Sequence, residues 1–295
     1  MKTLPIAAAL SLLAVACSSS QVVPDGGADA GFDDPPVVER QTLCDGQKHL
    51  RLWVLLGGGG QELAASYVRV ENGSPAFIVD GTCEYWATGE WRPDMLGRDR
   101  PVRTGTLTEA DVKAIEASIP LDDITPLADC PPPPAGFHDY STRVIRTETD
   151  TVTCAGTSGV RFDAAWTAVE GMAARLWDSG RPADGAIHVS AFGPTGLPPA
   201  ASSPQAYAWP LALPLSSFLL DSSFWSQKGV SSRVDDPVAA DLLRTLRDQY
   251  LAERSAHPGL YSSWDGLIAA DQTTTALVYM RDAMPYEDAR GLLVF

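Results

Sequence analysis

The chain has 295 residues, a formal net charge of −15 and five cysteines, and 45% of its residues are hydrophobic. This composition is that of a globular protein, and it excludes wholesale disorder and a fibrous repeat. At about 150 residues per domain, the length predicts one large or two modest domains. Because phosphate recognition depends on clustered positive charge, the acidic balance argues against a nucleic-acid partner.

Residues 1–16 have the organisation of a secretory signal peptide. Lys2 supplies a positive charge, and residues 4–16 are apolar apart from Ser11. This apolar stretch is shorter than the roughly 20 residues that a bilayer-spanning helix requires, and it fits the hydrophobic region of a signal peptide. We therefore expect residues 1–16 to be removed from the mature protein.

A cysteine lies at the expected cleavage point. The sequence Ala14-Val15-Ala16 is followed directly by Cys17 and three serines. This arrangement resembles the lipobox of bacterial lipoproteins, which implies that Cys17 is acylated and becomes the first residue. In lipoproteins of this kind, serine rather than aspartate after the cysteine implies sorting to the outer membrane. The same Ala14-Val15-Ala16 also suits the ordinary signal peptidase, which would release a soluble protein beginning at Cys17.

The segment between Cys17 and Leu43 is predicted to be a disordered acidic tether. It is rich in Asp, Gly, Ala and Pro and has little to bury. As a flexible coil it would span roughly 28 Å. Its aspartates lack the alternate spacing and terminal glutamate of an EF-hand loop, so we expect no calcium site there. The Asp-Gly-Ala run resembles linkers in myxobacterial-type envelope lipoproteins.

Four cysteines remain if Cys17 carries lipid. They are Cys44, Cys83, Cys130 and Cys154, an even number that suits an oxidising compartment outside the cytosol. Neither a Cys-x-x-Cys motif nor a Cys/His spacing suitable for zinc occurs, so we expect no metal site. Of three possible connectivities we favour Cys44–Cys83 and Cys130–Cys154, because each closes a local loop.

The folded body is predicted to begin with a first unit over residues 44–180. Apolar and alternating runs predict short strands, with turns at Asn72-Gly73 and Asp80-Gly81. Thr108 and Asp111 form a variant capping box at the start of a helix that Pro120 ends. The other elements expected in this unit are strands at 49–56, 66–70, 76–79 and 82–87 and a hairpin at 140–146 and 150–154. A second helix is expected at 163–178 and should end at Gly180. Its buried face is predicted to consist of Trp166, Val169, Ala173, Leu176 and Trp177.

A second unit is expected over residues 186–295. Pro210 and Pro214 interrupt the apolar segment 207–220, which excludes both a membrane-spanning helix and a central strand there. Asp236 and Pro237 start a helix that extends to about Glu253. The other expectations are a buried helix face of Val238, Leu242, Leu243, Leu246 and Tyr250, and strands at 186–192, 267–270, 273–280 and 291–295.

This element order predicts an α+β fold. We expect antiparallel sheets with helices packed on one face, in two similar strand–helix–hairpin units. A doubly wound parallel architecture is disfavoured, because strands and helices do not alternate strictly. The order resembles that of emfourin-type protease inhibitors, in which a sheet and helices form a small domain.

His138 is the best candidate for proton-transfer chemistry. It is followed by Asp139 and Tyr140, and a histidine beside a carboxylate and a phenol can move a proton. A turn held by side-chain hydrogen bonds next to the proline run 131–134 is the favoured alternative. Of the established catalytic motifs, neither a nucleophile elbow nor a zinc-protease signature is present.

Three other patterns are weaker candidates. Residues 57–60 are four glycines but lack the Lys-Ser/Thr of a phosphate-binding loop, so a flexible turn is expected. Arg281-Asp282 and Glu287-Asp288 carry carboxylates that could serve a glycosidase, but they are expected in an exposed turn. Tyr85, Trp86 and Trp91 could form a stacking platform, although strand alternation sends Tyr85 and Trp86 to opposite faces.

These observations favour a non-enzymatic envelope lipoprotein. We expect it to contact the membrane through acylated Cys17, to use no cofactor and to bind a protein or a glycan. One alternative is a hydrolase of envelope or extracellular polymers, with His138 or the acidic turns as its acid and base. Another is a protein that resembles a protease inhibitor.

Overall fold

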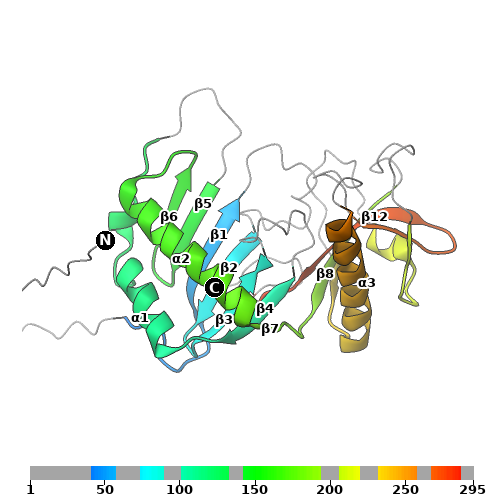
Figure 1. The fold of residues 1–295 in the computed structure, drawn as a ribbon, viewed down its shortest axis with the longest axis horizontal. Helices are drawn as coiled ribbons and strands as arrows, with labels where there is room; N and C mark the ends of the chain where they lie inside the picture. The colour runs from blue at the N-terminus through cyan, green and yellow to red at the C-terminus, as the bar shows by residue number, and fades with distance from the viewer. Residues whose placement is uncertain are drawn as a thin grey trace, which may run out of the picture. The chain divides into compact units, whose positions relative to one another are not determined.

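The computed structural model describes residues 41–57, 74–89, 101–132, 142–193, 206–219, 232–257 and 267–286. All of them belong to one compact unit, Arg40–Phe295. Within this unit the described strands form two sheets, and the described helices pack against them (Figure 1). The fold is α+β, as the sequence predicts.

The first sheet is antiparallel throughout its described part. Helices α1 (Glu109–Ser118) and α2 (Val160–Ser179) lie on one of its faces (Figure 1). Along the sheet its strands are β6 (Thr151–Ala155), β5 (Thr142–Thr147), β1 (Leu50–Gly57), β2 (Ser74–Asp80), β3 (Glu84–Thr88), β4 (Val102–Thr106) and β7 (Arg181–Pro182).

Strand alternation gives this sheet two apolar faces. In β1, Leu52 and Val54 belong to the core beneath α1 and α2, whereas Trp53 and Leu55 belong to a cluster on the opposite face. Met284, which follows the last strand of the second sheet, is also part of that opposite cluster. Strand β1, which lies inside the sheet, is therefore apolar on both sides, which explains its nearly unbroken hydrophobic sequence.

The second sheet carries one described helix, α3 (Pro237–Ala256). Its pairings are antiparallel except for the contact between β11 and β9. In order along the sheet the strands are β10 (Ser232–Val234), β8 (Ile187–Phe192), β12 (Thr275–Asp282), β11 (Leu267–Ala270) and β9 (Tyr207–Ala208).

Several predicted elements are confirmed and others lie outside the described residues. The helices and the strands β1, β2, β3, β5, β6, β8, β11 and β12 form close to where the sequence predicts them. The expected strands at 66–70 and 291–295 and the turn at Asn72-Gly73 lie outside the described residues. The short strands β4, β7, β9 and β10 were not predicted. In the described part, one sheet has seven strands and two helices and the other has five strands and one helix.

The predicted buried face of α3 is partly wrong. Leu243, Leu246 and Tyr250 are buried as expected, but Val238 is 68% exposed and Leu242 is 43% exposed. Their places on the sheet side are taken by Ala240 and by two buried arginines, Arg244 and Arg247, which bind Asp282 at the end of β12. The predicted face is wrong because an apolar pattern alone assigns arginine to the surface, whereas here Arg244 and Arg247 are buried by their ion pairs with Asp282.

Gly180 follows α2 for a spatial reason. Its φ is −74°, so it does not use the left-handed conformation common at helix ends. A Cβ at this position would lie 3.0 Å from the carbonyl oxygen of Leu176 and 3.0 Å from the hydroxyl of Tyr85. The glycine therefore lets the end of α2 pack closely against β3.

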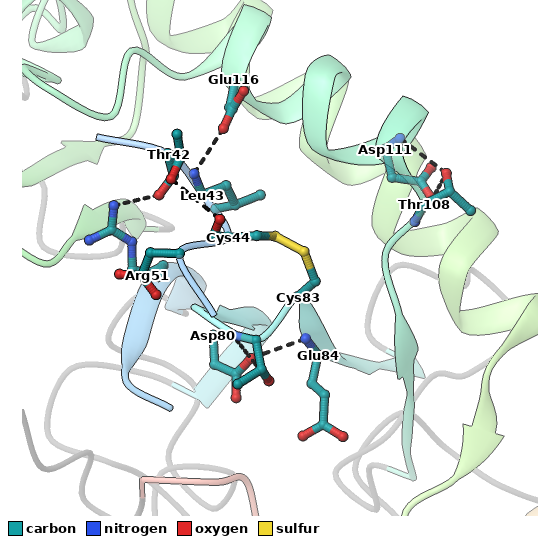
Figure 2. Close-up of a disulfide and its surroundings, with 12 residues drawn as sticks. Thr42, Leu43, Cys44, Arg51, Asp80, Cys83, Glu84, Thr108, Asp111 and Glu116 are labelled. Carbon is teal, nitrogen blue, oxygen red and sulfur yellow. Dashed lines mark hydrogen bonds between the residues drawn. A yellow bond between two sulfur atoms is a disulfide. The ribbon is translucent and has the colours of Figure 1, made fainter. Parts of the chain in front are cut away.

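The capping box at the start of α1 is confirmed. The Thr108 hydroxyl accepts a hydrogen bond from the Asp111 amide, and the Asp111 carboxylate accepts one from the Thr108 amide (Figure 2). Arg175 of α2 binds the same carboxylate at 2.6 Å. Burial would raise the pKa of Asp111, but these hydrogen bonds and the arginine hold it below its ordinary value.

Replacing this cap gives a first testable expectation. Thr108→Ala removes the partner of an otherwise unsatisfied helix amide, so we expect the free energy of unfolding to fall by about 1 kcal/mol. Urea unfolding followed by circular dichroism measures the change. Ser118→Ala is the matched control, because the Ser118 hydroxyl only returns to a carbonyl within the same helix. Equal midpoints for the two variants would contradict the role of the cap.

None of the described helices is long and apolar enough to cross a membrane.

Candidate functional site

The point at which the N-terminal segment joins the body is the best-defined candidate site. We call residues Gln41–His49 and the side chains that hold them the N-terminal junction. Leu43 is fully buried, and its amide donates to the Glu116 carboxylate of α1 at 2.8 Å. The Thr42 carbonyl accepts a hydrogen bond from Arg51 at 2.5 Å (Figure 2). A nearby arginine of β1 and a distant glutamate of α1 thus fix a segment without regular structure.

A disulfide completes the attachment of this segment. Cys44 is bonded to Cys83, which directly precedes β3, and their Cα atoms are 5.2 Å apart (Figure 2). Cys130 is bonded to Cys154 of β6, with a Cα separation of 5.7 Å. The pairing that the shorter loops favour is therefore the one in the structure.

Four charged or titratable side chains meet at the junction. His49 Nε2 lies 2.8 Å from Asp45 Oδ2, and its Nδ1 lies 3.8 Å from Glu148 Oε1. Glu148 also binds Arg51 at 2.6 Å. Asp45 and His49 belong to the junction, Arg51 to β1 and Glu148 to the turn between β5 and β6. These contacts hold the N-terminal segment against the first sheet.

The electrostatics of Asp45 favour its ionised form. The Gln47 amide donates to Oδ1 at 2.9 Å and is the main cause that lowers the pKa of Asp45; the nearby His49 and Arg51 lower it further. A carboxyl group whose pKa is lowered on folding stabilises the fold above its ordinary pKa. That contribution is lost as the pH falls through the lowered value. Acid therefore removes a contribution that ionised Asp45 makes to the junction.

Gly81 allows the junction to approach the turn between β2 and β3. A Cβ at this position would lie 2.4 Å from Asp45 Oδ1, 2.4 Å from the Gln47 carbonyl oxygen and 2.8 Å from the His49 ring. The Gly81 carbonyl also accepts a hydrogen bond from the Gly46 amide at 2.7 Å. The close contacts that a Cβ would make require the absence of a side chain at this position.

This close approach makes Gly81→Ala a sensitive test of the junction. We expect the substitution to lower the free energy of unfolding by about 1–3 kcal/mol, because a methyl group must displace main-chain atoms. Gly171→Ala is the control: a Cβ at Gly171 of α2 meets nothing within 4 Å. The control should stabilise the protein by about 0.5–1 kcal/mol, since alanine favours a helix over glycine. Thermal unfolding of both variants measures the contrast, and shifts of the same sign would contradict the expected crowding.

Several residues singled out from the sequence lie outside the described residues. They include the proposed acylation site and the best candidate for proton transfer. The full set is Cys17, His138, Asp139, Tyr140, Trp91, Glu287, Asp288 and the glycines 58–60.

Tyr85 and Trp86 point to opposite faces of the first sheet, as alternation predicts. Tyr85 is 3% exposed in the core beneath α2, and its hydroxyl donates to the Leu176 carbonyl at 2.9 Å. Trp86 packs against the cluster on the other face. The two rings therefore form no common stacking platform.

The expectation that Arg281 and Asp282 lie in an exposed turn is wrong. Both are in β12, and their exposed fractions are 3% and 2%. Asp282 binds Arg244 at 2.6 Å and Arg247 at 2.9 Å, and it accepts a hydrogen bond from the Val102 amide of β4 at 2.9 Å. Because these partners occupy both oxygens, the carboxylate is structural and ties the second sheet to the first.

A second contact between the sheets involves Asp80 and Tyr286. The Tyr286 hydroxyl donates to Asp80 Oδ2 at 3.2 Å. Burial and the Asp80 charge raise the pKa of Tyr286 above its ordinary value, so the phenol stays protonated. Asp80 is fully buried, and its other oxygen accepts from Thr82 and Glu84 at the turn before β3 (Figure 2).

Sequence reasoning missed the charged group at the junction. The only local signal is the spacing of Asp45 and His49 next to Cys44, and the partner Glu148 is distant in the chain. Among the described residues, no cluster of His, Cys, Asp or Glu side chains is suited to hold a metal ion. His188 is fully buried in β8, as its position in a predicted strand implies, and His257 ends α3.

Comparisons with protein-family models, with curated proteins and with solved structures found no match to this chain.

Proposed function

We propose that the protein is an envelope lipoprotein held to a membrane by acyl chains on Cys17, and that its disulfide-bonded body binds a partner without catalysing a reaction. The observation that carries the proposal is that the cysteines of the body are paired in disulfides. Four of the five form disulfides. Such bonds persist outside the reducing cytosol. The remaining cysteine, Cys17, is the residue that the lipobox pattern assigns to acylation.

The N-terminal junction supports this assignment. A membrane anchor on Cys17 would reach the body through the segment before Leu43, and the junction fixes that segment with a disulfide, the Leu43–Glu116 hydrogen bond and buried Leu43 itself. Three acyl chains would make attachment effectively permanent, since each buried CH₂ contributes about 0.8 kcal/mol. The outer membrane is the proposed location.

One candidate acid of the hydrolase alternative has a structural role instead. This residue is Asp282, whose carboxylate is bound by two buried arginines. The charged group at the junction consists of side chains that bind one another. These arrangements favour a binding protein over an enzyme.

Metabolic labelling tests the anchor directly. We expect the wild-type chain to incorporate an alkyne-tagged fatty acid and to sediment with membranes, and Cys17→Ser to lose the label and appear in the soluble fraction. Ser18→Ala is the matched control and should retain both properties. Ser18→Asp should keep the label but move from the outer-membrane to the inner-membrane fraction. A Cys17→Ser product that still sediments with membranes would overturn the proposal.

A further inference from the structure

A cavity of about 620 Å³ opens beside the edge of the second sheet. One side of the cavity is the proline-containing loop that follows β9, and the other side is the turn between β11 and β12. Six of the nine lining residues are apolar, among them Trp209, Leu211 and Pro214, and main-chain and side-chain polar atoms make up about half of the exposed lining. Ligand pockets in proteins have volumes of roughly 300–1,000 Å³, so one or two side chains of a partner fit here.

The floor of the cavity is rigid. Trp209 is 8% exposed, its indole N–H donates to the Leu213 carbonyl at 2.9 Å, and its ring packs edge-on against Phe218. Asp271 accepts hydrogen bonds from the amides of Leu215 and Thr273. These bonds fix the loop and the turn to each other, so the cavity does not depend on a mobile side chain.

Among the described strands, β9 forms a main-chain edge of the second sheet beside the same cavity. β9 is the last strand in the order of the second sheet. The Trp209 amide donates inward to the Ala270 carbonyl at 2.8 Å. Since neighbouring residues of a strand direct their main-chain groups to opposite sides, the N–H and C=O of Ala208 point away from the sheet. Ala208 is exposed and lines the cavity, and no described residue hydrogen-bonds to it there.

A polar side chain stands at the mouth. Gln272 is exposed, lines the cavity and has no hydrogen-bond partner among the described residues. A carboxamide both donates and accepts, which suits a peptide group. The described lining contains no Lys or Arg, and the Asp271 carboxylate is already occupied within its own turn. The site therefore favours an uncharged side chain flanked by a main chain.

We propose that the cavity and the edge at Ala208 together bind an extended segment of a partner protein. The segment pairs its main chain with Ala208 and places one apolar side chain in the cavity. Strand addition at an open sheet edge, with specificity from a neighbouring pocket, is an established mode of peptide recognition. A small apolar ligand would leave the Ala208 edge and Gln272 unused. The proposal names the partner chemistry of the binding function proposed above and rests on it.

The test uses the detergent-solubilised full-length protein and a displayed library of random peptides of about twelve residues. We expect enriched peptides to share an apolar residue. Ala212→Trp should weaken their binding about tenfold or more, because Ala212 lines the cavity and is exposed, so an indole there fills it. Ala208→Pro should do the same by removing the edge N–H. Ala252→Trp, on an exposed position of α3, should bind as the wild type does.

Each other outcome has a defined meaning. N-methylation of the peptide next to its apolar residue should weaken binding; a peptide that tolerates N-methylation at every position contradicts strand pairing. Failure to enrich any peptide, or equal binding to Ala212→Trp, overturns the proposal. So does a dimer of this chain that Ala212→Trp dissociates, since the occupant would then be a second copy. The assay is repeated with Cys17→Ser, which should bind the peptides as the wild type does, because peptide binding does not require acylation. Failure of the peptide site and failure of the membrane anchor are therefore distinguishable.

Discussion

Asp282→Asn should lower the free energy of unfolding by about 3–5 kcal/mol, the largest effect that we expect of any single substitution here. The change is nearly isosteric, so it creates no cavity. It removes the buried charge that faces Arg244 at 2.6 Å and Arg247 at 2.9 Å and leaves them, among their described charged partners, only the exposed Asp241 and Asp248. Breaking a buried ion pair by removing one partner leaves the other charge buried without compensation, which is far more costly than losing a surface pair. Urea unfolding at neutral pH measures the difference.

The control uses the same substitution on the same arginine. Asp241 binds Arg244 at 3.1 Å, but its side chain is 77% exposed. Exposed ion pairs contribute about 0–1 kcal/mol, so Asp241→Asn should change stability only slightly. Similar losses for Asp282→Asn and Asp241→Asn would show that burial does not govern the energetics of this group.

A combined replacement separates charge from packing. Changing Arg244 and Arg247 to Met together with Asp282→Leu removes all three buried charges at once. Such replacements in buried ionic groups are often neutral or stabilising. We therefore expect the triple variant to be more stable than Asp282→Asn. Recovery should be incomplete, because the Val102 amide loses the acceptor that it has at 2.9 Å.

The sequence predicts most of the regular structure, because local patterns determine it. The alternating and apolar runs of β1, β8 and β11 and the capping box of α1 are visible in short windows. β4 is different: its sequence, Val-Arg-Thr-Gly-Thr, has a single large apolar residue. It is a strand because β3 and β7 pair with it on either side, which only the folded chain supplies.

The charged contacts are less predictable for the same reason. The Cys44–Cys83 pairing follows from loop length, but Arg51 and Glu148 are separated by 97 positions. Asp282 likewise joins an arginine of α3 to an amide of β4. No local pattern distinguishes a carboxylate buried by such contacts from one in an exposed turn. Sequence reasoning therefore assigned Asp282 to the surface.

Removal of the Cys44–Cys83 disulfide should have the second large effect. The bond closes a loop with a sequence separation of 39. In the chain-entropy model, losing a cross-link of this size lowers the free energy of unfolding by about 4 kcal/mol. Cys44→Ser with Cys83→Ser tests this in urea under oxidising conditions. We also expect limited proteolysis to cut near residue 44 in this variant and not in the wild type, because the junction loses its covalent link.

The backbone at Cys83 allows a sharper version of the experiment. Its φ is +66°, a left-handed conformation that costs a residue with a Cβ roughly 1–2 kcal/mol relative to glycine. Cys44→Ser with Cys83→Gly should therefore be more stable than the double serine variant by about 1 kcal/mol, although both lack the disulfide. If the glycine variant is equal or less stable, the turn has relaxed once the bond is gone. In that case the disulfide, rather than the hydrogen bonds that the Thr82 and Glu84 amides donate to Asp80, holds Cys83 in this conformation.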